Sequence, residues 1–141
     1  MSDKSFPIIP MMAYENGVAA MEWLCKAFGF SEKARMLDEN GRLMHGELMF
    51  GNAIIMLASP DKNYQSPKHH QQVCEIAAAW YKSPYIINGL LVHVDDIEKH
   101  YQQAKKYGAK ILSEIEKGGP GTRYRAEDLE GQRWMFIEKN Q

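Results

Sequence analysis

Apolar residues follow a helical spacing in two segments of this chain and a strand-like spacing in the segments around them. The helical segments cover about residues 17–28 and 96–107. Each begins after a capping-type residue and ends at an aromatic residue followed by glycine, which is typical of helix boundaries. Alternating or continuous apolar runs predict strands at residues 6–14, 30–37, 43–50, 53–58, 87–94, 109–115, 122–127 and 132–138. Each helix is therefore preceded by one strand and followed by three.

This order of elements occurs twice because the chain contains an internal repeat. Gly29 and Gly108, which follow the two helices, stand 79 positions apart. Gly51 and Gly131, which precede the last strand of each half, stand 80 positions apart. A repeat of this length indicates two copies of a domain-sized unit and not a solenoid. We expect an α+β fold with two βαβββ modules, and we expect the functional site in a cleft that the two halves share.

The expected single domain covers residues 1–141, with module one at about 5–58, an inserted connection at about 59–85 and module two at about 86–139. The connection has no counterpart in the second module. Its residues 71–81 are rich in helix formers, and Ser83-Pro84 would end a helix there. A long insertion beside a cleft serves as a lid, a dimer arm or a plain linker, and the sequence leaves all three open.

Composition is that of an ordinary globular protein. The 141 residues are 45% hydrophobic and carry a net charge near −1. No basic stripe is present, so we expect neither nucleic acid nor an anionic membrane as partner. No apolar run has the length of a membrane span, and the first residues lack a signal-peptide core, so we expect a cytoplasmic protein. Cys25 and Cys74 match no zinc motif and support no disulfide framework.

Three short motifs resemble the vicinal-oxygen-chelate superfamily, which includes glyoxalase, bleomycin-resistance and dioxygenase-like proteins. They are the segments 24–30 (LCKAFGF), 92–96 (VHVDD) and 125–134 (RAEDLEGQRW), in an order that fits the repeat. The resemblance covers almost the whole chain and is greatest to the glyoxalase/bleomycin-resistance-like group. It implies two modules with strongly curved mixed sheets that form a cavity. It also implies a homodimer.

Metal-dependent members of this superfamily take one ligand from the first and last strand of each module. Carried onto this chain, the four positions fall near Pro10, Met56, Gly89 and Met135. None of these residues is a ligand for a hard or borderline divalent cation, which needs imidazole or carboxylate donors. We therefore expect no metal and no other cofactor.

A displaced metal site is the alternative to a metal-free protein. His45 and Glu47 are two residues apart and share one face of a strand. His93 lies on the face of its strand that carries Gly89, so the three side chains would converge if their strands adjoined. Polar cross-strand contacts are the simpler interpretation. If the protein is an enzyme resembling glyoxalase I, Glu47 is the candidate base, with His45 or His93 assisting.

Strand alternation predicts an apolar, sulfur-rich cavity for a small molecule. Its expected lining residues are Met12, Tyr14, Met56, Leu91, His93, Arg133 and Met135, with Trp80 from the connection as a further wall. A closed core filled by methionine is the competing interpretation. The sequence thus favours a metal-independent small-molecule-binding protein that sequesters an antibiotic or a toxic metabolite. A glyoxalase-like lyase or isomerase and a structural dimer without ligand remain the alternatives.

Overall fold

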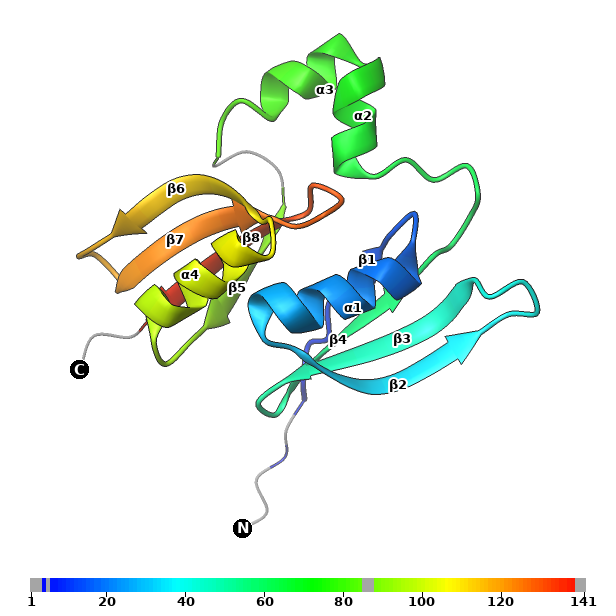
Figure 1. Ribbon diagram of the computed structural model, residues 1–141, viewed down its shortest axis with the longest axis horizontal. Helices are drawn as coiled ribbons and strands as arrows, with labels where there is room; N and C mark the ends of the chain where they lie inside the picture. Colours follow the sequence, from blue (N-terminus) through cyan, green and yellow to red (C-terminus); the bar gives the residue numbers. More distant parts are fainter. Residues whose placement is uncertain (1–3, 5, 85–87, 139–141) are drawn as a thin grey trace.

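The computed structural model describes residues 4, 6–84 and 88–138. Its first module contains β1 (Met11–Ala13), α1 (Gly17–Phe28), β2 (Ser31–Leu37), β3 (Leu43–Phe50) and β4 (Ala53–Ala58). The connection contains α2 (Pro67–Val73) and α3 (Glu75–Trp80). The second module contains β5 (Gly89–His93), α4 (Ile97–Lys106), β6 (Lys110–Glu116), β7 (Thr122–Glu127) and β8 (Arg133–Glu138). Figure 1 shows the two modules side by side, which confirms the predicted fold class.

Both modules build the same four-stranded mixed sheet. The strand order is β1-β4-β3-β2 in the first, here called sheet 1, and β5-β8-β7-β6 in the second, here called sheet 2. In each sheet the first strand of the module pairs in parallel with the last, and the remaining pairs are antiparallel. A parallel partner needs a crossover connection, and the module's helix and two intervening strands supply it.

Equivalent capping residues start and stop the two helices. The side chain of Asn16 accepts a hydrogen bond from the backbone N–H of Ala19, and that of Asp96 accepts one from Lys99. Gly29 and Gly108 follow the helices with φ angles of 83° and 89°, a left-handed conformation that glycine adopts without strain. The N-caps lie 80 positions apart and these glycines 79, so the stretch from N-cap to glycine is one residue longer in the first module than in the second.

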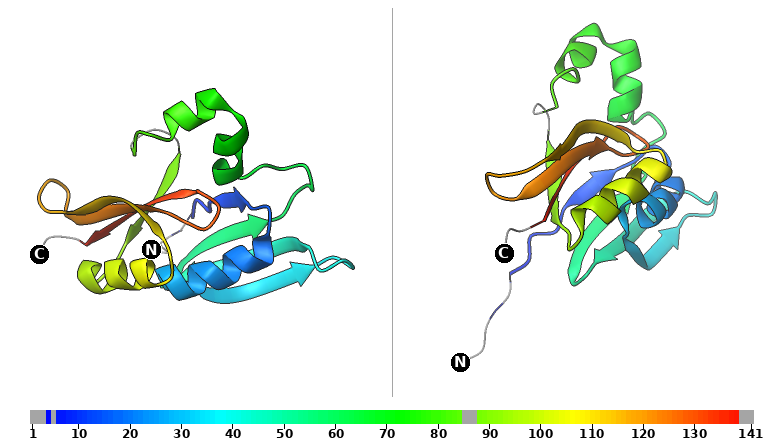
Figure 2. Two further views of the ribbon diagram at one scale, coloured as in Figure 1. Left: turned by 45° about the horizontal axis from the view of Figure 1, so that its top comes forward. Right: turned by 60° about the vertical axis from the view of Figure 1, so that its left-hand side comes forward.

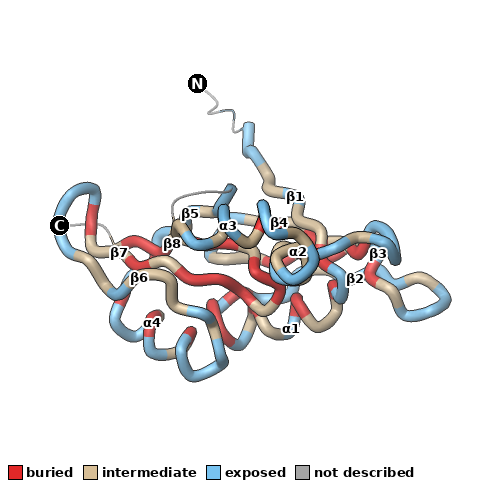
Figure 3. Tube along the Cα trace, turned by 90° about the horizontal axis from the view of Figure 1, so that it is seen from above, coloured by how far each residue is buried: buried red, intermediate tan, exposed pale blue. Residues whose placement is uncertain are grey.

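The core lies between the helices and one face of each sheet. Helices α1 and α4 pack against each other, and Figure 2 shows them together beneath the two sheets. Phe28 of α1 makes edge-to-face contacts with Trp134 and Phe136 of β8, so the aromatic core crosses the module boundary. Figure 3 shows that the buried residues gather in this layer. The opposite faces carry exposed apolar side chains such as Met11 of sheet 1 and Leu91 of sheet 2, and we call them the open faces.

His100 of α4 is a second link between the modules. One ring nitrogen lies 2.8 Å from the carbonyl oxygen of Phe28, and the other lies 2.6 Å from the hydroxyl of Tyr124. Burial disfavours the charged imidazole and lowers the pKa of His100 below its ordinary value. The neutral ring can donate to Phe28 and accept from Tyr124 at the same time, so it satisfies both partners.

The connection forms two short helices where the sequence predicted one helix over 71–81. They meet at Cys74, whose sulfur accepts a hydrogen bond from the backbone N–H of Ala77 and caps α3. Ser66 anchors the start of α2, because its N–H donates to the carboxylate of Glu15. Beyond this anchor the two helices stand away from the sheets in Figures 1 and 2, and we call them the arm (residues 67–80). No helix in the described part of the chain is long and apolar enough to cross a membrane.

Candidate functional site

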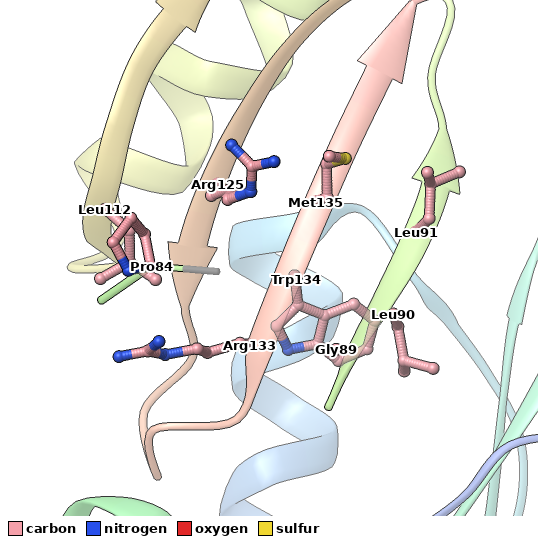
Figure 4. Close-up of a pocket in the computed structure, with 9 residues that line it drawn as sticks. All are labelled: Pro84, Gly89, Leu90, Leu91, Leu112, Arg125, Arg133, Trp134 and Met135. Atoms are coloured by element: carbon pink, nitrogen blue, oxygen red, sulfur yellow. The ribbon is translucent and has the colours of Figure 1, made fainter. Parts of the chain in front are cut away.

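A pocket of about 210 Å³ lies on the open face of sheet 2. Figure 4 shows its walls, which come from β5, β6, β7 and β8 and from the end of the connection. The lining residues are Pro84, Gly89, Leu90, Leu91, Leu112, Arg125, Arg133, Trp134 and Met135. Most of these side chains are apolar, and two arginines provide the charged groups. Such a combination is typical of sites for small organic molecules.

Strand register explains why these residues meet. Met135 pairs with Leu91 on one side and with Arg125 on the other, so the three side chains form a row across the open face. Their neighbours Trp134 and Phe136 point to the helices, where Phe136 is fully buried and Trp134 nearly so. Alternation along β8 therefore turns the side chain of Met135 to the open face and those of Trp134 and Phe136 to the core, although Trp134 also borders the pocket.

Arg133 forms one end of the pocket and fixes the connection to it. Its guanidinium makes a salt bridge of 3.1 Å with Glu127, and both side chains are only 5% exposed. The same group donates to the carbonyl oxygens of Tyr81 and Ser83, and it lies 5.0 Å from the centre of the Tyr81 ring. One buried arginine thus holds the segment that supplies Pro84 to the pocket.

Several residues predicted to line the cavity lie in this pocket, and others lie elsewhere. Leu91, Arg133 and Met135 line it. Met56 occupies the equivalent face of sheet 1 and does not line this pocket. His93 lies at the exposed end of β5 outside the lining set, and Trp80, which is 49% exposed, belongs to the arm and not to the pocket.

The structure corrects the predicted face of the first strand. Met11, not Met12, pairs with Met56, which places Met12 and Tyr14 on the core side of sheet 1. Tyr14 is fully buried there. The glycines that follow the two helices lie 79 positions apart, and the prediction used the same spacing to align the two strands that precede the helices. Before the helices the spacing is 80, as the N-caps Asn16 and Asp96 show. A register error of one residue moves every side chain to the opposite face.

Tyr14 belongs instead to a buried hydrogen-bond network around Asp128. Its hydroxyl donates to Asp128 over 2.6 Å, and the indole N–H of Trp134 donates to the same carboxylate oxygen over 3.1 Å. The other oxygen accepts the backbone N–H groups of Glu130 and Gln132. Burial raises the pKa of Asp128 to about 6, although these donors favour the ionised form. The network joins the residue that follows β1 in one module to the β7–β8 turn of the other.

The displaced metal site is not formed. His45 and Glu47 lie together on β3, with a ring nitrogen and a carboxylate oxygen 3.5 Å apart, whereas His93 lies in the other sheet. Within the described ranges, no group of three or more His, Cys, Asp or Glu side chains is placed to hold a metal ion. His45 and Glu47 also lie on sheet 1 and not in the pocket on sheet 2.

The positions that hold metal in related proteins do not fit a metal in this chain. In the observed register the equivalent neighbours are Met11 with Met56 and Leu91 with Met135. These side chains, like Pro10 and Gly89, offer thioether sulfur or no donor at all. A nickel, zinc, iron or manganese site needs several imidazole or carboxylate donors.

Arg125 and Leu112 are pocket residues that the sequence analysis missed. Apart from Trp80 of the connection, all the predicted cavity walls lay on the first and last strands of each module. Arg125 lies on the strand between, and its alternation with the buried residues Tyr124 and Ala126 is a sequence signal that it faces away from the core. The signal for Leu112 is weaker, because β6 has irregular register next to it.

Several solved structures share this fold. TioX from Micromonospora sp. ML1 is 22% identical, with 96% of this chain and 98% of that one covered and a TM-score of 0.67. TnmS3, an antibiotic binding protein from Streptomyces sp. CB03234, is 14% identical, with 98% and 100% covered and a TM-score of 0.62. The fosfomycin resistance protein FosX from Listeria monocytogenes is 8% identical, with 98% and 96% covered and a TM-score of 0.65. No curated protein sequence matches the chain.

The sequence profile of one family matches residues 11–136, which extend from the first residue of β1 into β8. The match includes both modules and the connection, in agreement with the repeated βαβββ order and the two equivalent sheets. The chain belongs to the glyoxalase/bleomycin resistance protein/dioxygenase superfamily.

Proposed function

We propose that this protein binds a small organic molecule in the pocket of sheet 2 without the help of a metal ion, and that binding sequesters an antibiotic or a toxic metabolite. The observation that carries the proposal is the row of Leu91, Met135 and Arg125 on an open sheet face, inside a pocket with mostly apolar walls. The antibiotic-binding description of TnmS3 supports antibiotics as the first ligands to screen.

The chemistry of the pocket supports binding over catalysis. His45 and Glu47, the candidate acid–base pair, lie on sheet 1, so a ligand in the pocket of sheet 2 does not meet them. Arg133 and Glu127 neutralise each other and are nearly buried. General acid–base catalysis needs a titratable group within hydrogen-bond reach of the reacting atoms, and the row Leu91–Met135–Arg125 offers only apolar surface and a permanently charged guanidinium.

The test is a fluorescence titration with N-phenylnaphthylamine, a neutral aromatic probe, before and after treatment with a chelator. We expect the same affinity in both cases, and a metal content well below one ion per chain. Leu91→Asn should weaken binding about tenfold, because it removes an apolar wall. Met44→Asn is the matched control, since Met44 is 58% exposed and Leu91 55%. Stoichiometric metal whose removal abolishes binding would contradict the proposal.

We also propose that the protein forms a homodimer through the arm. Val73, Ile76 and Trp80 of the arm are 61%, 64% and 49% exposed, an apolar surface that association would cover. A second copy of this chain is the proposed partner, as the resemblance to dimeric superfamily members implies. Light scattering at micromolar concentration should give twice the chain mass, and Ile76→Glu should shift the protein towards monomer. A monomeric wild-type protein would contradict this proposal.

A further inference from the structure

The two helices of the arm are too short to be stable by themselves. Helix α2 has seven residues and α3 has six, whereas isolated helices shorter than about 12–15 residues are marginal in water. Burial adds little, because among these helical residues, all of which the structure describes, only Ala77 is buried. The order of the arm therefore depends on the contacts that hold its two ends to the body.

The start of the arm is anchored to the loop after β1 and to the β7–β8 turn. The N–H of Ser66 donates to the carboxylate of Glu15, and the N–H of Lys68 donates to the carbonyl oxygen of Glu130 over 2.9 Å. The carboxylate of Glu130 in turn accepts the N–H groups of Glu15 and Asn16. The described lining of the pocket on sheet 2 includes none of these residues, so a ligand in the pocket does not contact this anchor.

The other end of the arm is anchored at the pocket itself. Residues 81–84, here called the end segment, follow α3 directly. Arg133 donates to the carbonyl oxygens of Tyr81 and Ser83, and Pro84 forms a wall of the pocket. Every other described lining residue belongs to a strand of sheet 2. A ligand in the pocket can therefore contact the sheet and the end segment at the same time.

Such a ligand favours the arrangement in which the arm is held. If the end segment leaves Arg133, the pocket loses its Pro84 wall. A ligand that needs this wall binds the held arrangement better and, at about ten times its dissociation constant, lowers the fraction of open arm about tenfold. Resting on the proposed function, we propose that the arm is a strap closed by the ligand: occupancy of the pocket orders the end segment and α3, and with them the apolar surface proposed for the homodimer.

Hydrogen–deuterium exchange of the whole protein, followed by mass spectrometry, measures the opening of the strap. The N–H groups of Ala78, Tyr81 and Ser83 form hydrogen bonds within α3 and the end segment, so they exchange when this part opens. With N-phenylnaphthylamine at about ten times its dissociation constant, exchange in a peptide that covers residues 75–83 should slow about tenfold. The β2–β3 turn in the other sheet, which has its own backbone hydrogen bonds, is the reference and should not change.

Pro84→Ala separates the strap from the rest of the binding surface. It removes part of the wall that joins the ligand to the end segment, while the walls on sheet 2 remain. The probe should bind within about threefold of its wild-type affinity but slow the exchange of residues 75–83 less than about threefold. Pro60→Ala is the matched control, because Pro60 is an exposed proline of the same connection outside the described pocket lining. It should behave as the wild type does.

Three results would overturn the strap and leave the pocket as the binding site. They are probe binding without slower exchange in residues 75–83, equal slowing in the β2–β3 turn, and full protection in Pro84→Ala. If the probe does not bind, or if Leu91→Asn does not weaken its binding, the proposed function fails and the inference fails with it.

Discussion

Replacing Arg133 with methionine is expected to lower the free energy of unfolding by about 3–5 kcal/mol. The substitution leaves the carboxylate of Glu127 buried without its cation and removes the donors of the Tyr81 and Ser83 carbonyl groups. An unpaired buried charge is costly because little solvent can replace the lost partner. Urea denaturation followed by circular dichroism measures the effect.

A second ion pair in the same sheet provides the control. Arg123 and Glu116 have the same nitrogen–oxygen distance of 3.1 Å, but their side chains are 20% and 41% exposed. Arg123→Met should therefore cost less than about 1 kcal/mol. The double variant Arg133→Met/Glu127→Met should lose less stability than the sum of its two single variants, because no unpaired charge remains. An Arg133→Met loss no larger than that of Arg123→Met would show that the buried pair does not hold this end of the pocket.

Asp128→Ala is the other substitution with a large expected effect, also a loss of about 3–5 kcal/mol. It leaves the hydroxyl of Tyr14 and the indole N–H of Trp134 buried without their acceptor. It also removes the acceptor of two backbone N–H groups in the β7–β8 turn. Chemical denaturation at neutral pH measures the loss. Tyr14→Phe deletes one of the four donors to Asp128, and the other three still hydrogen-bond its carboxylate. This substitution should therefore cost only about 1 kcal/mol.

The pH dependence of stability gives an independent check on Asp128. Because burial raises its folded-state pKa from 3.8 to about 6, the folded protein binds this proton more tightly than the unfolded chain. Stability from this group is therefore greatest at low pH and falls as the pH rises from about 4 to about 6. The stability of wild type relative to Asp128→Asn should fall by roughly 3 kcal/mol between pH 4 and pH 7. If the difference in stability between wild type and Asp128→Asn did not change with pH, the raised pKa of Asp128 would be contradicted.

The order and type of the elements could be predicted from the sequence because local signals fix them. Asn16, Gly29 and Gly108 mark helix ends in the sequence and also in the structure, whereas the second helix begins at Ile97, one residue later than predicted, after its cap Asp96. The strands β3, β4 and β7 have the predicted bounds. The first strand is shorter than predicted, at three residues. Pro7 and Pro10, which precede it, lack the N–H groups that a longer strand would use.

The fold and the absence of ligand-type residues at Met56 and Met135 were thus determined by the sequence alone. Which residues share the pocket was decided only by the tertiary structure. Alternation gives each strand two faces, but pairing across the sheet decides which face turns to the core. For β1, one extra residue between the N-cap and the glycine of the first module reversed the predicted face. The assembly of the two sheets likewise separated His45 and Glu47 from His93, and the pairing of β5 with β8 brought Leu91 beside Met135. Such contacts join residues far apart in the chain, and no local propensity encodes them.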